Sequence, residues 1–149
     1  MEWAGDFDIF ITKQDGTVEH EHINNTITTA GLNLLRDAIK GDVTDLQLKY
    51  LAVGTSSTAV AITDIQLGAE VFRTAILSYN TGGEGILQTT ALILDNEAVE
   101  NIREVGIFAG STASSATNSG IMISRILYSR NKTNLESIQF NRTDTIGRV

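Results

Sequence analysis

His20 and His22 are the two histidines of the chain, and they flank Glu21 in a segment whose polar alternation predicts a β-strand. Side chains two residues apart on a strand share one face, so both imidazoles can reach the same metal ion. Two ligands from one chain are too few for a stable site, but a symmetric trimer would place three such pairs around a metal on its axis. The alternative interpretation is a solvated edge strand on which His-Glu-His binds no metal.

A second group of residues has the chemistry of buried ion pairs. An isolated charge in a protein core is very costly, so charged groups persist there when they are paired. Strand alternation places Glu104 on the face of Ile102 and Phe108, and it places Arg125 on the face of Ile123. We therefore predict a buried Glu–Arg network that bridges adjacent strands through bidentate guanidinium bonds. Its five members lie in or beside apolar strand segments: Glu70, Arg73, Arg103, Glu104 and Arg125.

Other catalytic patterns are not recognisable. No serine lies in a Gly-x-Ser-x-Gly elbow, and Gly82-Gly83-Glu84-Gly85 lacks the lysine of a phosphate-binding loop. The chain has no cysteine, which removes thiol nucleophiles, thiolate metal sites and disulfides. The sequence thus predicts a non-enzymatic protein that needs no cofactor. A hydrolase is an alternative that requires His20 or His22 to lie beside a serine or a carboxylate.

Two kinds of element must position these residues. The alternation of Phe7, Ile9 and Ile11 with polar residues predicts a strand, and Asp15-Gly16 predicts a hairpin turn into a second strand over residues 18–23. Helical spacing of leucines, a cap at Thr28 or Thr29 and a terminal Gly41 predict one helix over residues 29–40. On that helix the apolar stripe is Leu32, Leu35 and Ile39, widened by Leu34 and Ala38.

The rest of the chain is read as strands joined by turns and loops. The predicted strands cover residues 48–53, 71–79, 86–94, 102–108, 121–128 and 135–140. Short connections favour antiparallel pairing, and so many strands need two packed layers. We predict a mainly β fold, an antiparallel β-sandwich with one helix, as a single domain over residues 1–149.

Four segments are candidates for contact with other molecules. Two polar loops of small residues, Thr55 to Gln66 and Gly110 to Ser119, are candidate contact surfaces. The polar run over residues 142–149 is predicted to be a C-terminal arm that orders on a neighbouring subunit. The segment 121–128 is apolar on both faces, which predicts that a second layer or another subunit covers it.

Composition limits the partners of the chain. The formal net charge is −7 and the pI is about 4.7, which argue against a broad basic surface for DNA or RNA. The N-terminus lacks the basic and apolar regions of a signal peptide, and no window has the apolar length of a membrane span. We therefore expect a protein assembled in the cytoplasm without a membrane span.

Several blocks along the chain resemble, in order, a family of short virion proteins of tailed bacteriophages. The specific parts are Ala52-Val53-Gly54-Thr55 and Ile102-Arg103-Glu104-Val105-Gly106-Ile107-Phe108. The family pattern often has a proline after Gly54, where this chain has Val60, and that departure concerns the shape of the loop. The full set of blocks is Trp3 to Phe7, Asn25 to Leu32, Leu48 to Thr55, Leu67 to Arg73, Ile102 to Phe108, Ser124-Arg125 and Lys132-Thr133.

The resemblance implies a structural protein of the virion, assembled in the host cytoplasm. Such a protein would form a symmetric oligomer, a trimer or a hexamer, at the tail tip, the baseplate or a fibre attachment point, and would dock other virion proteins. The alternatives are a capsid decoration or head-fibre protein, and a module that binds a host glycan or receptor.

Overall fold

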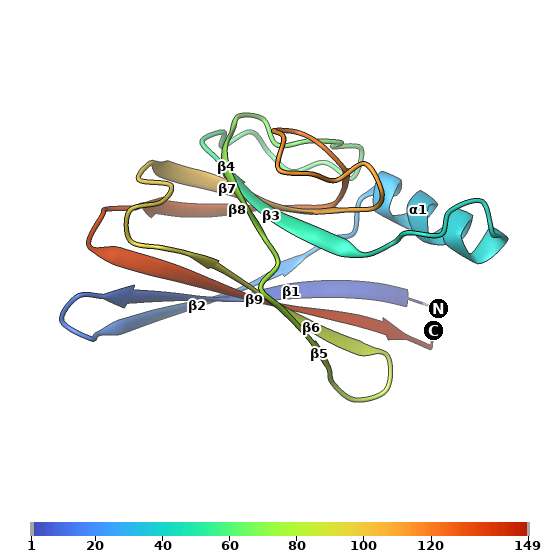
Figure 1. Ribbon diagram of the computed structural model, residues 1–149, viewed down its shortest axis with the longest axis horizontal. Coiled ribbons are helices and arrows are strands. Elements are labelled where there is room, and N and C mark those ends of the chain that lie inside the picture. Colours follow the sequence, from blue (N-terminus) through green and yellow to red (C-terminus); the bar gives the residue numbers. More distant parts are fainter. Residues whose placement is uncertain (1, 149) are drawn as a thin grey trace.

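The computed structural model describes residues 2–148, which form nine strands and one helix. Two antiparallel sheets pack face to face, with strand orders β2-β1-β9-β6-β5 and β4-β3-β7-β8 (Figure 1). This confirms the predicted β-sandwich with one helix. The elements are β1 (Glu2–Lys13), β2 (Val18–Asn25), α1 (Thr29–Lys40), β3 (Leu48–Gly54), β4 (Glu70–Ala75), β5 (Ser78–Thr81), β6 (Ile86–Ile93), β7 (Asn101–Ala109), β8 (Ile121–Asn131) and β9 (Glu136–Gly147).

The main core lies between the two sheets. On β1 the odd-numbered residues Phe7, Ile9 and Ile11 are buried, as the period-two pattern predicts. The Phe140 ring lies edge-on to both Phe7 and Tyr128, with centroids 6.4 and 6.2 Å away. Each such fully buried side chain stabilises the fold by roughly 1.5–3 kcal/mol.

The β1–β2 hairpin and the helix begin and end at the predicted signals. Asp15 accepts a hydrogen bond from the Thr17 amide in the turn, and Gly16 adopts a φ of 86°. The Thr28 hydroxyl caps the helix by accepting from the Gly31 amide at 2.9 Å, and it donates to the carbonyl of Met122 on β8. Gly41 closes the helix in the left-handed conformation, with φ at 94°.

The buried side of α1 matches the predicted stripe only in part, since Leu34 is buried as predicted and Leu35 and Ala38 are half-buried. Leu32 and Ile39 are 49% and 69% exposed, whereas Gly31 and Leu34 are buried. A Cβ at Gly31 would lie 3.3 Å from the Ile123 backbone, so the smallest residue of the helix is where it approaches β8. Apolar spacing alone cannot reveal such a close backbone contact.

The strand predicted over residues 71–79 is in fact two strands in different sheets. β4 pairs with β3, and β5 pairs with β6. The change occurs between two adjacent amides, because Ile76 donates to Lys49 of β3 and Leu77 donates to Thr90 of β6. The apolar pattern continues through this corner because both sheets face the same core.

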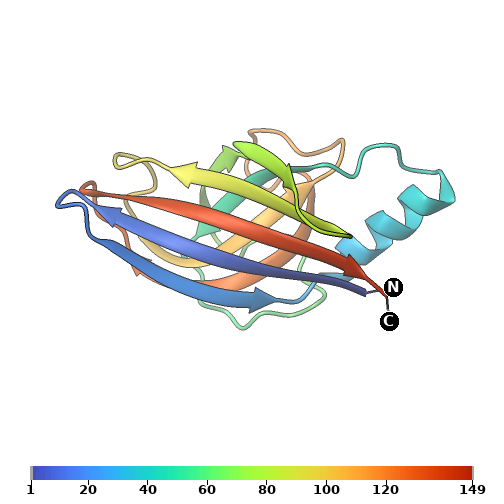
Figure 2. The ribbon, with the colours of Figure 1, turned by 90° about the horizontal axis from the view of Figure 1, so that it is seen from below.

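The predicted C-terminal arm is wrong for residues 142–147, which belong to β9. This strand lies between β1 and β6 in the middle of the five-stranded sheet (Figure 2). The polar sequence of residues 142–144 suggests exposure to solvent. Arg142 and Asp144 can nevertheless be buried, because their charges pair with each other. Val149 lies outside the described residues. Among residues 2–148 no helix has the length and apolar character needed to cross a membrane.

Candidate functional site

Two long loops lie together over the outer face of the four-stranded sheet. The β3–β4 loop consists of residues 55–69, and the β7–β8 loop consists of residues 110–120. Both lie on the side of the sheet that faces away from the other sheet (Figure 1). They contain the four residues that bound the predicted contact loops, namely Thr55, Gln66, Gly110 and Ser119. Long loops without regular structure are usually functional or disordered, and these two are held in place by buried ion pairs.

Glu104 on β7 holds both ends of the β3–β4 loop. Its carboxylate is fully buried and accepts hydrogen bonds from the amides of Ser56, Gly68 and Ala69 at 3.0, 2.7 and 2.9 Å. It also accepts from Arg125 Nε at 2.8 Å. One carboxylate therefore joins the start of the loop, the end of the loop and the neighbouring strand β8.

Arg125 extends the same anchor into the body of the loop. Its guanidinium donates to the Thr58 carbonyl at 2.9 Å and reaches Asp64 Oδ2 at 3.4 Å. The side chain is buried, so its charge is balanced mainly by Glu104. A planar group with donors in several directions is suited to this position, and a lysine could not replace it.

Two glycines allow the loop to approach Glu104. A Cβ at Gly54 would lie 2.5 Å from the Ala69 carbonyl oxygen, and a Cβ at Gly68 would lie 2.5 Å from the Ser56 side chain. Real Cβ atoms essentially never come so close to other atoms. Both glycines are therefore required by the packing of the loop on the carboxylate.

Glu104 stays ionised in this setting. Burial raises the pKa of its carboxyl, but Arg125 and the amides of Gly68, Ala69 and Ser56 lower the pKa by more, and the net shift is below the ordinary value. The group therefore acts as a permanent acceptor at neutral pH and has no proton to donate in catalysis.

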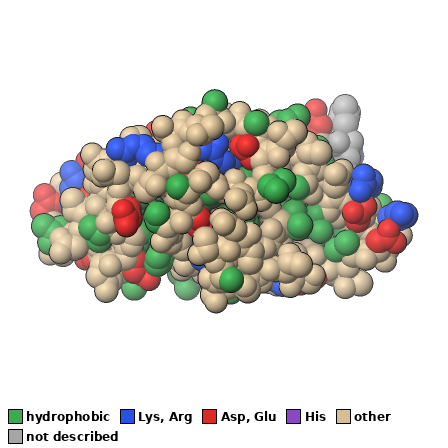
Figure 3. Space-filling view, turned by 90° about the horizontal axis from the view of Figure 1, so that it is seen from above, with side chains coloured by type: hydrophobic (Ala, Val, Ile, Leu, Met, Phe, Trp, Pro, Cys, Tyr) green, Lys and Arg blue, Asp and Glu red, His purple; other side chains and the backbone are tan. Residues whose placement is uncertain are grey.

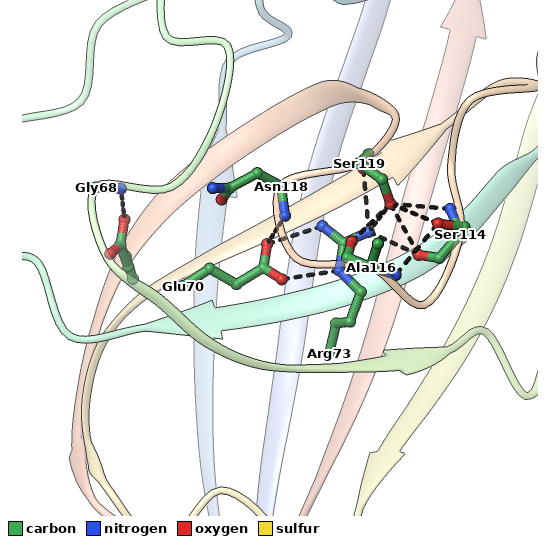
Figure 4. A network of polar contacts seen from close by, with 8 residues as sticks. Gly68, Glu70, Arg73, Ser114, Ala116, Asn118 and Ser119 are labelled. Carbon is green, nitrogen blue, oxygen red and sulfur yellow. Dashed lines mark hydrogen bonds and ion pairs between the residues drawn. The ribbon is translucent and has the colours of Figure 1, made fainter.

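A second ion pair holds the β7–β8 loop (Figure 4). Arg73 and Glu70 of β4 are joined by two bonds of 2.8 Å, and both side chains are buried. The remaining Arg73 nitrogen donates to the carbonyls of Ser114 and Ser119 at 2.9 and 3.0 Å, and to the Ser119 hydroxyl. The guanidinium also lies over the ring of Phe108, with Cζ 4.5 Å from the centroid.

The predicted network is thus two separate pairs, and one of its five members is wrong. Glu104 pairs with Arg125 and Glu70 pairs with Arg73, whereas the Arg103 guanidinium donates to the Ile102 carbonyl and to Asn131. Arg103 lies where the pairing of β7 with β8 shifts register. The alternation of apolar and polar residues in the sequence does not show where such a register shift occurs.

The same irregularities overturn part of the predicted sharing of faces, although Glu104 does lie on the same outer face as Phe108. Ile102 and Ile123 belong to the main core between the sheets, whereas Glu104 and Arg125 lie under the β3–β4 loop. A smaller core fills the space between the loops and the sheet. The loops are the second layer expected over segment 121–128. The buried residues of the smaller core are Ala52, Leu67, Phe108 and Met122.

One buried ion pair was missed by sequence reasoning. Arg142 and Asp144 of β9 are joined by two bonds of 2.9 Å inside the sandwich. Arg142 also donates to Ser124 of the opposite sheet at 2.6 Å, and Trp3 donates to Asp144 at 2.8 Å. The sequence does contain a signal for this pair, because strand alternation places Arg142 and Asp144 on the same face as Phe140.

The two histidines lie on the other side of the sandwich, next to a carboxylate. His20 Nε2 and His22 Nδ1 are 2.8 and 2.9 Å from the same Asp8 oxygen, and His22 Nε2 is 3.1 Å from Asn24. The hydrogen bonds to Asp8 and Asn24 raise the pKa of His22. The carboxylate required for the hydrolase alternative is present, but within residues 2–148 neither imidazole has a hydrogen bond to a hydroxyl group.

The outer surface of the two loops is nearly uncharged, and it combines small polar residues with three exposed apolar side chains of the β3–β4 loop. Val60, Ile62 and Ile65 are 43%, 58% and 69% exposed. Asp64 is the single charged residue of the β3–β4 loop and is paired with Arg125, and the β7–β8 loop contains no charged residue. Figure 3 shows this face, on which most charged side chains gather toward the two ends. A fixed surface of this composition can bind another protein.

Comparisons of the chain with protein-family models, with curated proteins and with solved structures found no match.

Proposed function

We propose that this chain is a non-enzymatic structural protein of a tailed-phage virion, which assembles by docking the surface of its two anchored loops. We define this loop surface by the exposed residues Val60, Ile62 and Ile65 of the β3–β4 loop together with the adjoining Val71 of β4. The proposed location is the tail tip, the baseplate or a fibre attachment point.

One observation carries the proposal. The blocks that resemble phage virion proteins supply the parts of the Glu104 anchor, because they contain Gly54, Gly68, Glu104 and Arg125. The common effect of these residues is to hold the β3–β4 loop in one conformation, which reduces the entropy lost when the loop binds a partner.

We propose that a second copy of the chain binds this surface. Each copy carries a formal net charge of −7, so copies repel one another unless they meet through an uncharged area. The loop surface is such an area, and the centres of protein interfaces are depleted of charged residues in the same way.

The test is the absolute mass of the purified chain, measured by light scattering on a sizing column. We expect a discrete trimer or hexamer. Replacing two exposed residues of the loop surface, Ile62→Asp with Ile65→Asp, should convert it to a folded monomer. Leu135→Asp is the control, because Leu135 is as exposed as Ile62 but lies in the β8–β9 turn. A monomeric wild type, or a double variant that keeps its mass, would contradict the proposal.

The alternative of a glycan-binding module has a specific observation in its favour. An open groove of about 280 Å³ lies over β6 and β9 in the five-stranded sheet. Its lining includes Asn80, Gln88, Thr90 and Asn141, whose amides and hydroxyl can bond to sugar hydroxyls. Binding on a glycan array that Gln88→Ala and Asn141→Ala abolish would favour this function over assembly.

A further inference from the structure

The outer face of the β1–β2 hairpin gathers four side chains of metal-binding type. The strand register places Asp8 opposite His22 and Phe10 opposite His20, and it places Asp6 one pair further along, opposite Asn24. All of these side chains project from the same face of the five-stranded sheet, which is the face seen in Figure 2.

Three of them form a compact set of ligands. One ligand atom from each of Asp6, Asp8 and His22 lies within 4.8 Å of the other two. Ligands held about 2.1 Å from one ion are at most about 4.2 Å apart, so a small rotation of exposed side chains completes the set. His20 and His22 are about half exposed, which leaves room for that rotation.

The surroundings of the set have the form of an outer shell around a metal. His22 Nε2 donates its proton to Asn24 Oδ1, a bond that fixes the ring and directs Nδ1 toward the Asp8 carboxylate. His20 lies 2.8 Å from Asp8 and is stacked on Phe10, with ring centroids 4.5 Å apart. His20 can therefore orient the Asp8 carboxylate without itself binding the ion.

The local charge also favours a cation. Asp6 and Asp8 are neighbours on one face, and within residues 2–148 neither forms an ion pair with a lysine or an arginine. Two carboxylates and an imidazole match the preferences of first-row divalent ions such as zinc, whereas calcium and magnesium prefer oxygen ligands alone.

We propose that Asp6, Asp8 and His22 bind one divalent transition-metal ion of the zinc class, with His20 as a positioning residue. The site is complete within one chain. It needs no symmetry axis, in contrast to the trimer expected from the two histidines alone. The proposal does not depend on the proposed function, because the loop surface lies over the other sheet.

Zinc titration of the full-length chain without a histidine tag, followed by calorimetry, tests the proposal. We expect one zinc ion per chain. Asp8→Asn and His22→Gln should abolish binding, and His20→Gln should weaken it by about 10- to 100-fold, as for other outer-shell residues. Calcium should not compete for the site.

Glu21→Gln is the matched control. It removes a carboxylate from the same strand, between the two histidines, but on the opposite face. Absence of zinc binding by the wild type would overturn the proposal, as would equal loss of binding in Glu21→Gln and Asp8→Asn. Thermal melts without zinc should show that all variants are folded, since the replaced side chains are on the surface.

Discussion

At the scale of single residues, buried charge in this protein is used to hold backbone in place. The Glu104 carboxylate bonds to three loop amides, and Arg73 donates to two loop carbonyls. Both groups are themselves paired with an opposite charge, so the cost of burying them is partly offset. The loops gain a fixed shape that their own small residues do not provide.

Glu104→Gln should lower the free energy of unfolding by about 3–5 kcal/mol, because it leaves the Arg125 charge buried without its partner. Urea denaturation measures this change. Glu84→Gln is the control, since it breaks the exposed pair with Arg148 and should change stability by less than about 0.5 kcal/mol. Similar losses in the two variants would show that Glu104 is not a structural anchor.

The ionisation of Glu104 also predicts that the stability of the protein depends on pH in the acid range. Its pKa is lowered in the folded state, so its contribution to stability is complete above the ordinary value of 4.5 and is lost as the pH falls through the lower folded value. The wild type should therefore lose more unfolding free energy than Glu104→Gln between about pH 5 and about pH 3. Parallel stability curves for the two proteins would contradict this.

Gly54→Ala tests the close approach of the loop to β3. The new methyl group would meet the Ala69 carbonyl, which must move, and we expect a loss of about 1–3 kcal/mol. Gly147→Ala is the control because its Cβ would meet no atom within 4 Å. Chemical denaturation should place the control within about 0.5 kcal/mol of the wild type.

At the scale of elements, the placement of β9 decides most of the architecture. It runs antiparallel to β1 along its whole length, from Glu2 opposite Gly147 to Lys13 opposite Glu136. On its other edge it pairs with β6. The last strand therefore lies in the middle of the sheet, beside the first strand, and the two termini lie side by side (Figure 2).

A chain that ends at Thr143 should fail to fold, because it loses the end of a central strand and leaves Arg142 buried without Asp144. The expected result is the loss of a cooperative thermal transition in circular dichroism. A chain that ends at Gly147 keeps β9 and loses the exposed bond from Arg148 to Glu84, so it should fold normally. A folded chain ending at Thr143 would instead support a C-terminal arm that is not needed for folding.

At the scale of the whole molecule, the two outer faces of the sandwich have different chemistry. The face of the four-stranded sheet carries the anchored loops, and the face of the five-stranded sheet carries amides, hydroxyls and the histidine–aspartate group. Because the main core separates these faces, a change of surface charge on one should not alter the other.

We therefore expect the two proposed activities to be lost independently. Asp8→Asn should keep the solution mass of the wild type, and the double variant Ile62→Asp with Ile65→Asp should still bind one zinc ion per chain. Light scattering and calorimetry on both variants measure this. Loss of both properties in either variant would show that assembly and metal binding share one surface.

Local signals in the sequence correctly predicted the elements that local chemistry controls. The Asp15-Gly16 turn, the cap at Thr28 and the left-handed Gly41 each depend on a few neighbouring residues, and each is found where predicted. The ion-pair residues Glu70, Arg73, Glu104 and Arg125 were also recognised, because a charge in an apolar segment requires a partner wherever that partner lies.

The sequence by itself therefore determined the β-sandwich class, the helix and the presence of buried charge. Only the tertiary structure decided which partner each charge has, where the chain crosses from β4 to β5, and that residues 142–147 form a central strand. The physical reason is that alternation reports which residues are buried but not what they are buried against. A register shift beside Arg103 moves side chains to the other face of the sheet, and mutual pairing allows Arg142 and Asp144 to be buried. Neither effect changes the local pattern of apolar and polar residues in the sequence.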